Sequence, residues 1–431
     1  MKEDIQETRL ENGLTILTDR MSGVRSATLG FFFRAGSRHE PDELNGISHF
    51  IEHTVFKGTP KRTSLDIAIE QDRLGGNLDA FTTHEETGFA IKVIDDQLPA
   101  AFDLIADMLA NPRFDDADLE SEQRVIIEEM KMVEDSPEEF LGEIFSREFF
   151  PGHPLGLSIA GTPTTVKVFD SVTTRRYHEQ VFNASNLVIA VAGNVDHAEV
   201  VEMAKSFWSS GFSLPAAKSG TLKRELQTLR PSYAAPIIIE QNENLEQAHL
   251  IIAVPFVAAA EQNRYAADLL ANIIGGGTSS RLWQKVREER GLAYSVGAST
   301  IMYHDCGFFS VFAGTSPDQV SEVVDITITE MKEVVRNGVT QDELELVKQQ
   351  TRASILLGLE DSAGRAATLA QSEMLHGRQI PVEETLANVD AVTVGEIQTL
   401  AAEHFKTEKL AFAALGDLKD LRIGRENLTV S

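Results

Sequence analysis

The sequence lacks disulfide-forming cysteine pairs, long apolar runs and any recognisable targeting segment. Its 431 residues include one cysteine, Cys306, which cannot form a disulfide within the chain and fits a reducing compartment. No run approaches the roughly 18 apolar residues of a transmembrane helix. The N-terminus is acidic and has no apolar segment of the kind found in secretory signals. We therefore expect a cytoplasmic protein with no membrane partner.

Basic residues are scarce relative to acidic ones. The sequence has 39 Lys and Arg against 66 Asp and Glu, a formal net charge of −27 at pH 7. Such a charge excludes general electrostatic attraction to phosphate backbones, so no nucleic-acid partner is expected. A negative field attracts basic partners such as basic peptides, although dispersed negative charge that serves only solubility is the common alternative. The 42% hydrophobic content is typical of a globular protein.

The same order of predicted elements occurs twice along the chain. In residues 26–134 and again in residues 247–357, the patterns predict a strand, two helices, a pair of strands and a pair of helices. Paired strands that alternate with paired helices are typical of an α+β fold with mainly antiparallel sheets, and the repetition indicates a duplication. We therefore predict two homologous α+β domains, each a mainly antiparallel sheet with packed helices.

The boundary between these domains is predicted in a segment rich in turn residues. Residues 209–233 contain several Ser, Gly and Pro and show no clear apolar period. We assign residues 1–212 to an N-terminal domain, residues 213–232 to a linker and residues 233–431 to a C-terminal domain.

Two histidines and a glutamate form a pattern suited to metal chemistry. The pattern is His49-x-x-Glu52-His53, in a segment predicted to be helical. Four helical residues turn through about 400°, so the two imidazoles lie about 40° apart around the axis and about 6 Å apart along it, which allows both to bind one Zn²⁺. Glu52 shares their face and could act on water without being a ligand. This residue order is the inverzincin signature, although an idle histidine pair is the alternative.

A hydrolytic zinc site needs a third protein ligand, and spacing alone leaves its identity open. The candidates lie in an acidic helix predicted at residues 115–134. Glu122 and Glu129 are seven residues apart and share a face, whereas Glu128 points about 100° away from Glu129. A solvated acidic face is the ordinary interpretation of such carboxylates.

Short segments elsewhere complete a pattern that extends along nearly the whole chain. They are Leu10-Glu11-Asn12-Gly13-Leu14, Phe56-Lys57-Gly58-Thr59, Asp135-Ser136-Pro137 and Ala192-Gly193-Asn194-Val195-Asp196. With these segments and His49-x-x-Glu52-His53, the chain resembles the pitrilysin/insulinase superfamily of zinc peptidases, specifically the branch of mitochondrial processing peptidase and its bacterial relatives.

The resemblance implies a complete metal site. Members of the superfamily carry a glutamate ligand some 76 positions after the second histidine, which here is Glu129. They also carry a glutamate seven residues before that ligand, outside the metal's own shell, and Glu122 occupies this position. The implied metal ligands are therefore His49, His53 and Glu129, with one Zn²⁺ per chain.

The second half has no His-x-x-Glu-His pattern, but it carries Arg287 and Tyr294. In the superfamily an arginine and a tyrosine with this spacing reach from the C-terminal domain toward the metal site, across a chamber that the two domains enclose. By resemblance, Arg287 and Tyr294 hold the substrate backbone and polarise the scissile carbonyl. Without the resemblance, an ion-paired arginine and a half-buried tyrosine are the simpler interpretation.

One segment departs from the superfamily pattern. Most members carry Asn-Ala-aromatic-Thr on the edge strand that pairs with the substrate, whereas this chain has Asp79-Ala80-Phe81-Thr82. The resemblance implies that a substrate binds as an added strand beside Ala80 and Phe81. Aspartate cannot donate the N–H of asparagine, and it adds negative charge. We expect Asp79 to favour a basic side chain in the substrate.

These features predict a zinc-dependent metalloendopeptidase that cleaves extended or unfolded peptides. Glu52 is expected to be the general base for a metal-activated water, with Tyr294 as an additional donor to the oxyanion. Because one chain carries both the metal set and the Arg/Tyr pair, we predict a homodimer. The alternatives are the catalytic subunit of a heterodimeric processing peptidase and a non-catalytic structural homologue.

Overall fold

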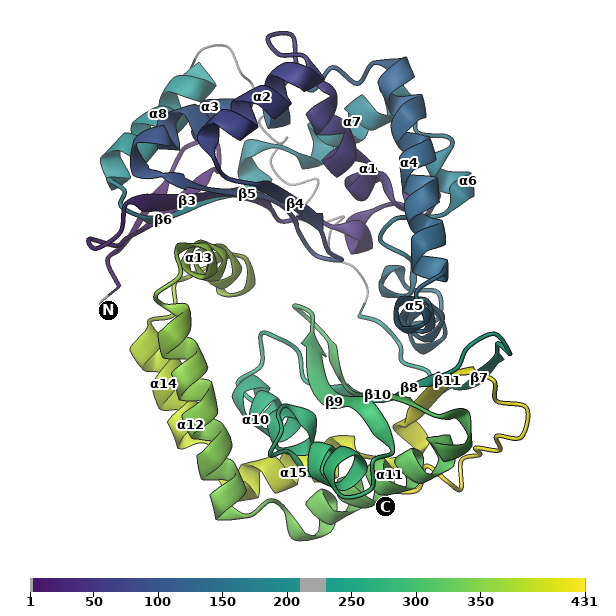
Figure 1. The fold of residues 1–431 in the computed structure, drawn as a ribbon. Coiled ribbons are helices and arrows are strands. Elements are labelled where there is room, and N and C mark those ends of the chain that lie inside the picture. Colours follow the sequence, from purple (N-terminus) through teal and green to yellow (C-terminus); the bar gives the residue numbers. More distant parts are fainter. Residues whose placement is uncertain (1–2, 210–229, 431) are drawn as a thin grey trace. The chain divides into compact units, whose positions relative to one another are not determined.

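Figure 1 shows the fold in a computed structural model that describes residues 3–209 and 230–430. Within these residues the chain divides into two compact units. Unit 1 consists of residues 3–132, 157–209 and 356–381, and unit 2 consists of residues 133–156, 230–355 and 382–430. Each unit therefore combines segments that are far apart in the sequence.

Unit 1 contains a six-stranded sheet with the strand order β1-β2-β6-β3-β5-β4. Strands β2 and β6 are parallel, and all other neighbours are antiparallel. The strands are β1 (Ile5–Arg9), β2 (Thr15–Arg20), β3 (Ser26–Phe33), β4 (Leu78–Thr82), β5 (Thr87–Ile94) and β6 (Leu187–Gly193).

Unit 2 contains a five-stranded sheet with the order β7-β11-β8-β10-β9. Strands β7 and β11 are parallel, and the remaining neighbours are antiparallel. The strands are β7 (Ile237–Gln241), β8 (Ala248–Phe256), β9 (Ala293–Met302), β10 (Gly307–Thr315) and β11 (Ala411–Gly416).

The two sheets repeat one arrangement. Strands β2-β6-β3-β5-β4 of unit 1 and β7-β11-β8-β10-β9 of unit 2 each begin with one parallel pair and continue with three antiparallel pairs. The prediction of an α+β fold with two related, mainly antiparallel sheets is therefore confirmed. Strands β4 and β9 each pair with one neighbour only, so they are the edge strands at corresponding ends.

Helices cover both faces of the unit 1 sheet (Figure 1). Phe31 of β3 packs against Phe102 on one face, whereas Phe32 packs near Leu369 on the opposite face. Coverage on both faces explains why successive residues of β3 are buried, including the three consecutive phenylalanines that end the strand. The helices are α1 (Ile47–Thr54), α2 (Ser64–Leu74), α3 (Leu98–Ala110), α4 (Asp116–Glu134), α6 (Pro163–Val166), α7 (Ser171–Val181), α8 (His197–Ser209) and α13 (Ser362–His376).

Buried ion pairs attach α13 to the unit 1 sheet. Arg365 Nη1 lies 2.5 Å from Asp19 Oδ2, and both side chains are almost fully buried. Glu373 accepts hydrogen bonds from Arg9 and Arg34 at 2.7–2.9 Å. A buried pair confers geometric specificity because either partner alone would be an uncompensated charge in the interior.

Unit 2 includes a helix from the first half of the sequence. Helix α5 (Pro137–Phe149) packs onto the unit 2 sheet through Phe145 and Phe149, whose rings contact Phe308 of β10. The other helices are α10 (Arg264–Gly275), α11 (Val320–Asn337), α12 (Gln341–Gly358), α14 (Val382–Ala391) and α15 (Val394–His404). Within residues 3–209 and 230–430, every helix is too short or too polar to span a lipid bilayer.

The sequence-based domain ranges did not include this exchange of segments. Ranges 1–212 and 233–431 are continuous, whereas α5 packs in unit 2 and α13 packs in unit 1. Most of the predicted linker, residues 213–229, lies outside the described residues. Whether the two predicted ranges act as separate domains stays a prediction.

We expect Arg365→Met to destabilise the protein by about 3–5 kcal/mol, because Asp19 would keep its charge in a buried position without a cation. Urea-induced unfolding measures this loss. Arg25→Met is the matched control, since the Arg25–Asp95 pair lies at the surface and should contribute little to stability. Equal losses in the two variants would contradict a special role for the buried pair.

Candidate metal centre

Helix α1 presents two imidazoles because its other side is buried. Ile47, Phe50 and Ile51 are fully buried in the unit 1 core, at the spacing of one helical face. His49 and His53 remain on the opposite side, with ring centroids 4.6 Å apart. The helical spacing predicted from the sequence therefore brings these two side chains together.

Helix α4 brings a carboxylate to these histidines. Glu129 Oε1 lies 3.7 Å from His49 Nε2, and Glu129 Oε2 lies 3.6 Å from His53 Nε2. One ligand atom from each of the three residues lies within 4.8 Å of the others, and no other such group of three occurs within the described residues. Glu128 points away, is well exposed, and pairs with Lys131 at 2.7 Å. Packing thus distinguishes two adjacent glutamates that spacing could not.

The geometry and chemistry of this group fit zinc. Tetrahedral Zn²⁺ with bonds of about 2.0–2.2 Å to N and O ligands holds its ligand atoms roughly 3.3–3.6 Å apart. The observed separations of 3.6 and 3.7 Å, each to a different oxygen of Glu129, are close to that spacing, and the three ligand atoms lie within 4.8 Å of one another. Burial lowers the pKa of His49 to about 4, and neighbouring His53 adds to the effect, so this imidazole is neutral, as a ligand must be.

Glu122 lies behind His53 instead of beside the ligand atoms. Its Oε2 is 3.2 Å from His53 Nδ1, and its Oε1 is 2.5 Å from Lys57 Nζ. Burial opposes ionisation of Glu122, but the hydrogen bonds from His53 and Lys57 lower the pKa of this carboxyl below its ordinary value. Because both oxygens are engaged, Glu122 orients His53 so that Nε2 faces the group of ligand atoms.

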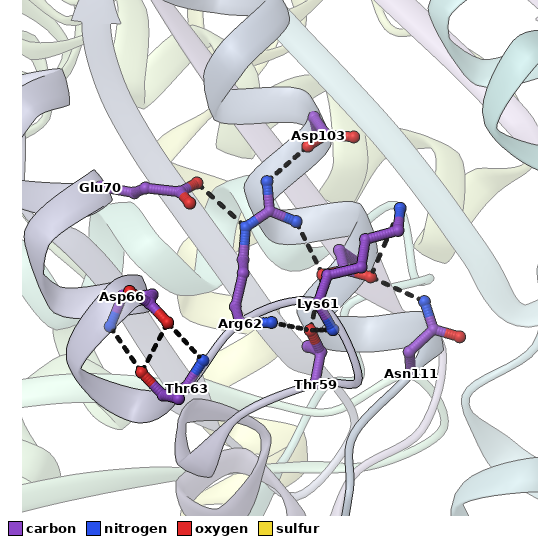
Figure 2. A network of polar contacts seen from close by, with 9 residues as sticks. Thr59, Lys61, Arg62, Thr63, Asp66, Glu70, Asp103 and Asn111 are labelled. Carbon is purple, nitrogen blue, oxygen red and sulfur yellow. Dashed lines mark hydrogen bonds and ion pairs between the residues drawn. The ribbon is translucent and has the colours of Figure 1, made fainter.

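A polar network fixes the chain segment that follows Lys57 (Figure 2). Arg62 pairs with Glu70, Asp103 and Asp107 at 2.5–3.0 Å. Asp107 is fully buried and also accepts a hydrogen bond from Thr59 at 2.8 Å. This network ties the turn after α1 to α2 and α3, which limits where Lys57 can lie.

Glu52 occupies a buried position on α1 and is not one of the three grouped residues. It is 8% exposed, and its Oε2 accepts a hydrogen bond from Thr82 Oγ1 of β4 at 2.7 Å. Burial raises the pKa of Glu52 above its ordinary value, while the Thr82 hydroxyl works against the rise. A carboxylate with a raised pKa is better able to accept and return a proton near neutral pH.

The predicted substrate strand is an edge strand. Asp79, Ala80 and Phe81 lie in β4, and β5 is the one strand among the described residues that pairs with it. Asp79 is exposed, and the Phe81 ring lies directly over Gly88, where a Cβ atom would be 2.4 Å from the ring. The free edge of β4 can accept an added strand.

Arg287 and Tyr294 belong to unit 2, where two backbone irregularities bring them together. Arg287 lies in a π-helical turn, Trp283–Glu288, and Tyr294 is the extra residue of a bulge between β9 and β10. The Arg287 guanidinium stacks 4.1 Å from the Trp283 ring and 4.9 Å from the Tyr294 ring. Their predicted role at the metal site of unit 1 stays a prediction.

The sequence matches a known peptidase family in both halves. Residues 15–163 match the profile of "Insulinase (Peptidase family M16)", and residues 174–351 match "Peptidase M16 inactive domain". An uncharacterized zinc protease of Streptomyces coelicolor is 36% identical over 98% of this chain and 91% of its own length. The chain belongs to the insulinase (M16) family. Its M16 relatives include the uncharacterized zinc protease YmxG of Bacillus subtilis, which is 34% identical over 95% of this chain and 98% of its own length.

Solved M16-like structures share the fold. A protease from Helicobacter pylori has a TM-score of 0.87 at 20% identity and covers 96% of this chain and 99% of its own. At that identity the similarity concerns the fold alone. The names of the M16 relatives support a zinc peptidase, while the individual site residues rest on the geometry described above.

Three contacts at these sites were missed by the sequence-based analysis. Lys57 holds Glu122, Thr82 donates to Glu52, and Trp283 stacks on Arg287. Lys57 and Thr82 belong to segments that resemble M16 landmarks, so the sequence marked these segments but gave no function for the two side chains. Trp283, four residues before Arg287, gave no such signal, because the π-helical turn that aligns the two cannot be read from spacing.

We expect Lys57→Met to weaken zinc binding by about tenfold, because Glu122 would lose its cation and orient His53 less firmly. Competition with a chromogenic chelator measures the affinity. Lys205→Met is the matched control, since Lys205 forms an exposed pair with Glu202 on α8 and should leave zinc binding unchanged. An unaltered zinc affinity in Lys57→Met would show that Glu122 orients His53 without a neighbouring cation.

Proposed function

We propose that the protein is a zinc-dependent endopeptidase that cleaves extended or unfolded peptides. The observation that carries the proposal is the grouping of His49, His53 and Glu129 beside a buried, non-ligating Glu52. These three residues would hold one Zn²⁺ per chain. When bound, zinc acts as a Lewis acid and increases the acidity of water, which is the chemistry of hydrolytic zinc sites.

Glu52 is proposed as the general base and acid. Its carboxylate would take a proton from the attacking water and pass it to the leaving amine of the peptide. The hydrogen bond from Thr82 keeps one carboxylate oxygen in place, and burial raises the pKa of Glu52, which favours acceptance of a proton. The hydrogen bond also supports the proposal because it joins Glu52 to β4, the strand along which the substrate is proposed to bind.

Substrate is proposed to bind along the free edge of β4. Main-chain hydrogen bonds to Ala80 and Phe81 would select an extended backbone instead of a particular sequence. The exposed carboxylate of Asp79 would add a preference for a basic side chain.

Arg287 and Tyr294 are proposed to hold the substrate backbone and to donate to the scissile carbonyl. The stack supports this role, because among the described residues no carboxylate pairs with the Arg287 guanidinium. Tyr294 is 79% exposed, which leaves its hydroxyl available to a ligand. In a chain with 66 acidic residues, an arginine held by two rings instead of a carboxylate keeps its donors for a carbonyl oxygen.

The proposed assembly is a cytoplasmic homodimer. One chain carries both the metal-binding set and the Arg/Tyr pair, so a second, different subunit is not required for chemistry. The same complete set argues against a purely structural homologue, and a heterodimer would need a partner that contributes recognition alone.

Glu52→Gln tests the mechanism. Glutamine has nearly the same shape but cannot take a proton, so we expect zinc content to be unchanged and peptide cleavage to fall by about 10²–10⁴-fold. Glu128→Gln is the control, since Glu128 is an exposed residue on α4 and should leave cleavage unchanged. Unaltered cleavage by Glu52→Gln would remove Glu52 from the mechanism, and zinc-loaded wild type without cleavage would favour the structural homologue.

Asp79→Asn tests the basic preference. We expect the ratio of kcat/KM for a basic peptide to that for its neutral counterpart to fall by up to about fivefold, the size of an exposed charge pair. Paired peptides that differ at one side chain, assayed at low salt, give this ratio. Asp72→Asn, on the exposed side of α2, should leave it unchanged. The basic preference is wrong if both variants keep the wild-type ratio.

A further inference from the structure

The helix that carries the histidines begins at a glycine that cannot cap it. Gly46 precedes α1 with φ +98°, a conformation that favours glycine. A Cβ atom at this position would lie 2.6 Å from the carbonyl oxygen of Ala160 and 2.8 Å from Gly161. The close approach of that backbone requires glycine, so the side chain that ordinarily caps a helix is absent.

The side chain of Glu40 accepts hydrogen bonds from the free N–H groups at the N-terminus of α1. Its Oε2 accepts a hydrogen bond from the Gly46 N–H and its Oε1 accepts one from the Ser48 N–H, both at 2.7 Å. Glu40 is 6% exposed, and within the described residues no Lys, Arg or His nitrogen forms an ion pair with its carboxylate. Burial raises the pKa of Glu40 to about 7 in spite of these donors. A buried acid without a cation is costly unless hydrogen bonds compensate, and here the N–H groups of Gly46 and Ser48 supply them.

The two histidines differ in how their rings are held. His53 Nδ1 contacts Glu122, whereas His49 Nδ1 is buried and has no hydrogen-bond partner within the described residues. A metal-binding histidine usually gains its orientation from such a partner. His49 therefore depends on the position of its own backbone, which directly follows Ser48.

We propose that Glu40 is a positioning residue for the metal centre, because it fixes the first turn of α1 and through Ser48 sets the backbone of His49. This inference rests on the proposed zinc site and concerns the affinity of that site. Glu40 thereby does for His49, through two backbone N–H groups, what Glu122 does for His53 through a side chain.

Two variants of Glu40 and one control are expected to differ in the hydrogen bonds that they can form. Glu40→Gln replaces one acceptor oxygen with an NH₂ group that faces an N–H donor, so one hydrogen bond becomes a repulsion. Glu40→Asp keeps both oxygens but is one methylene shorter, so it can reach only one of the two donors. Glu373→Gln is the matched control, since Glu373 is equally buried in unit 1 and binds Arg9 and Arg34 instead of α1.

The test is zinc affinity of the full chain, measured by competition with a chromogenic chelator. We expect Glu40→Gln to bind zinc at least about tenfold more weakly than wild type, with a smaller loss in Glu40→Asp. Glu373→Gln should bind zinc as wild type does, even though its thermal stability falls. Cleavage by Glu40→Gln should recover when zinc is in excess, with KM unchanged, because substrate contacts are intact.

Three results would overturn the inference. Wild-type zinc affinity in Glu40→Gln would show that the cap does not reach the metal centre. Equal losses in Glu373→Gln and Glu40→Gln would reduce the effect to general destabilisation. If Glu40→Gln does not fold, wild-type affinity in Glu40→Asp decides against the inference in the same way. A wild-type chain that binds no zinc would instead overturn the proposed metal centre itself.

Discussion

The burial of α1 and α4 in one hydrophobic core is the constraint on which the metal centre depends. Apolar side chains of both helices, among them Phe50, Ile51 and Ile126, are buried in the core of unit 1, and this shared burial fixes the position of each helix. The polar residues that follow the same helical faces then meet at the rim of that core. His49, His53 and Glu129 are held within ligand distance because the apolar residues beside them cannot move apart without exposing surface to water.

The polar contacts around these three residues hold the two histidines to different degrees. His53 is held through Glu122, which is itself held by Lys57, whereas His49 Nδ1 has no hydrogen-bond partner in the part of the chain that the structure describes. Two buried acids, Glu40 before α1 and Glu52 within it, accept hydrogen bonds from N–H and O–H groups, and no ion pair to either occurs among residues 3–209 and 230–430. Hydrogen bonds from fixed donors place a carboxylate precisely enough for chemistry without neutralising it.

The two halves of the sequence exchange α5 and α13, which duplication alone does not explain. Each sheet is complete within its own half of the sequence, yet α5 and α13 each pack on the sheet of the other half. The phenylalanines of α5 and the buried ion pairs of α13 show that each helix packs on its sheet through specific contacts. Neither half of the sequence contains all the elements that cover its own sheet.

The sequence by itself determined the local features. Helical spacing placed His49, Glu52 and His53 on one face, and repeated element order indicated two related α+β units, because both patterns depend on neighbours in the chain. Choosing Glu129 over Glu128 needed either a resemblance to known peptidases or the packing of α4. The roles of Lys57 and Glu40, and the exchange of α5 and α13, were decided only by the tertiary structure. These contacts join side chains, helices or sheets whose meeting depends on core packing, and packing is a property of the whole fold that no local pattern encodes.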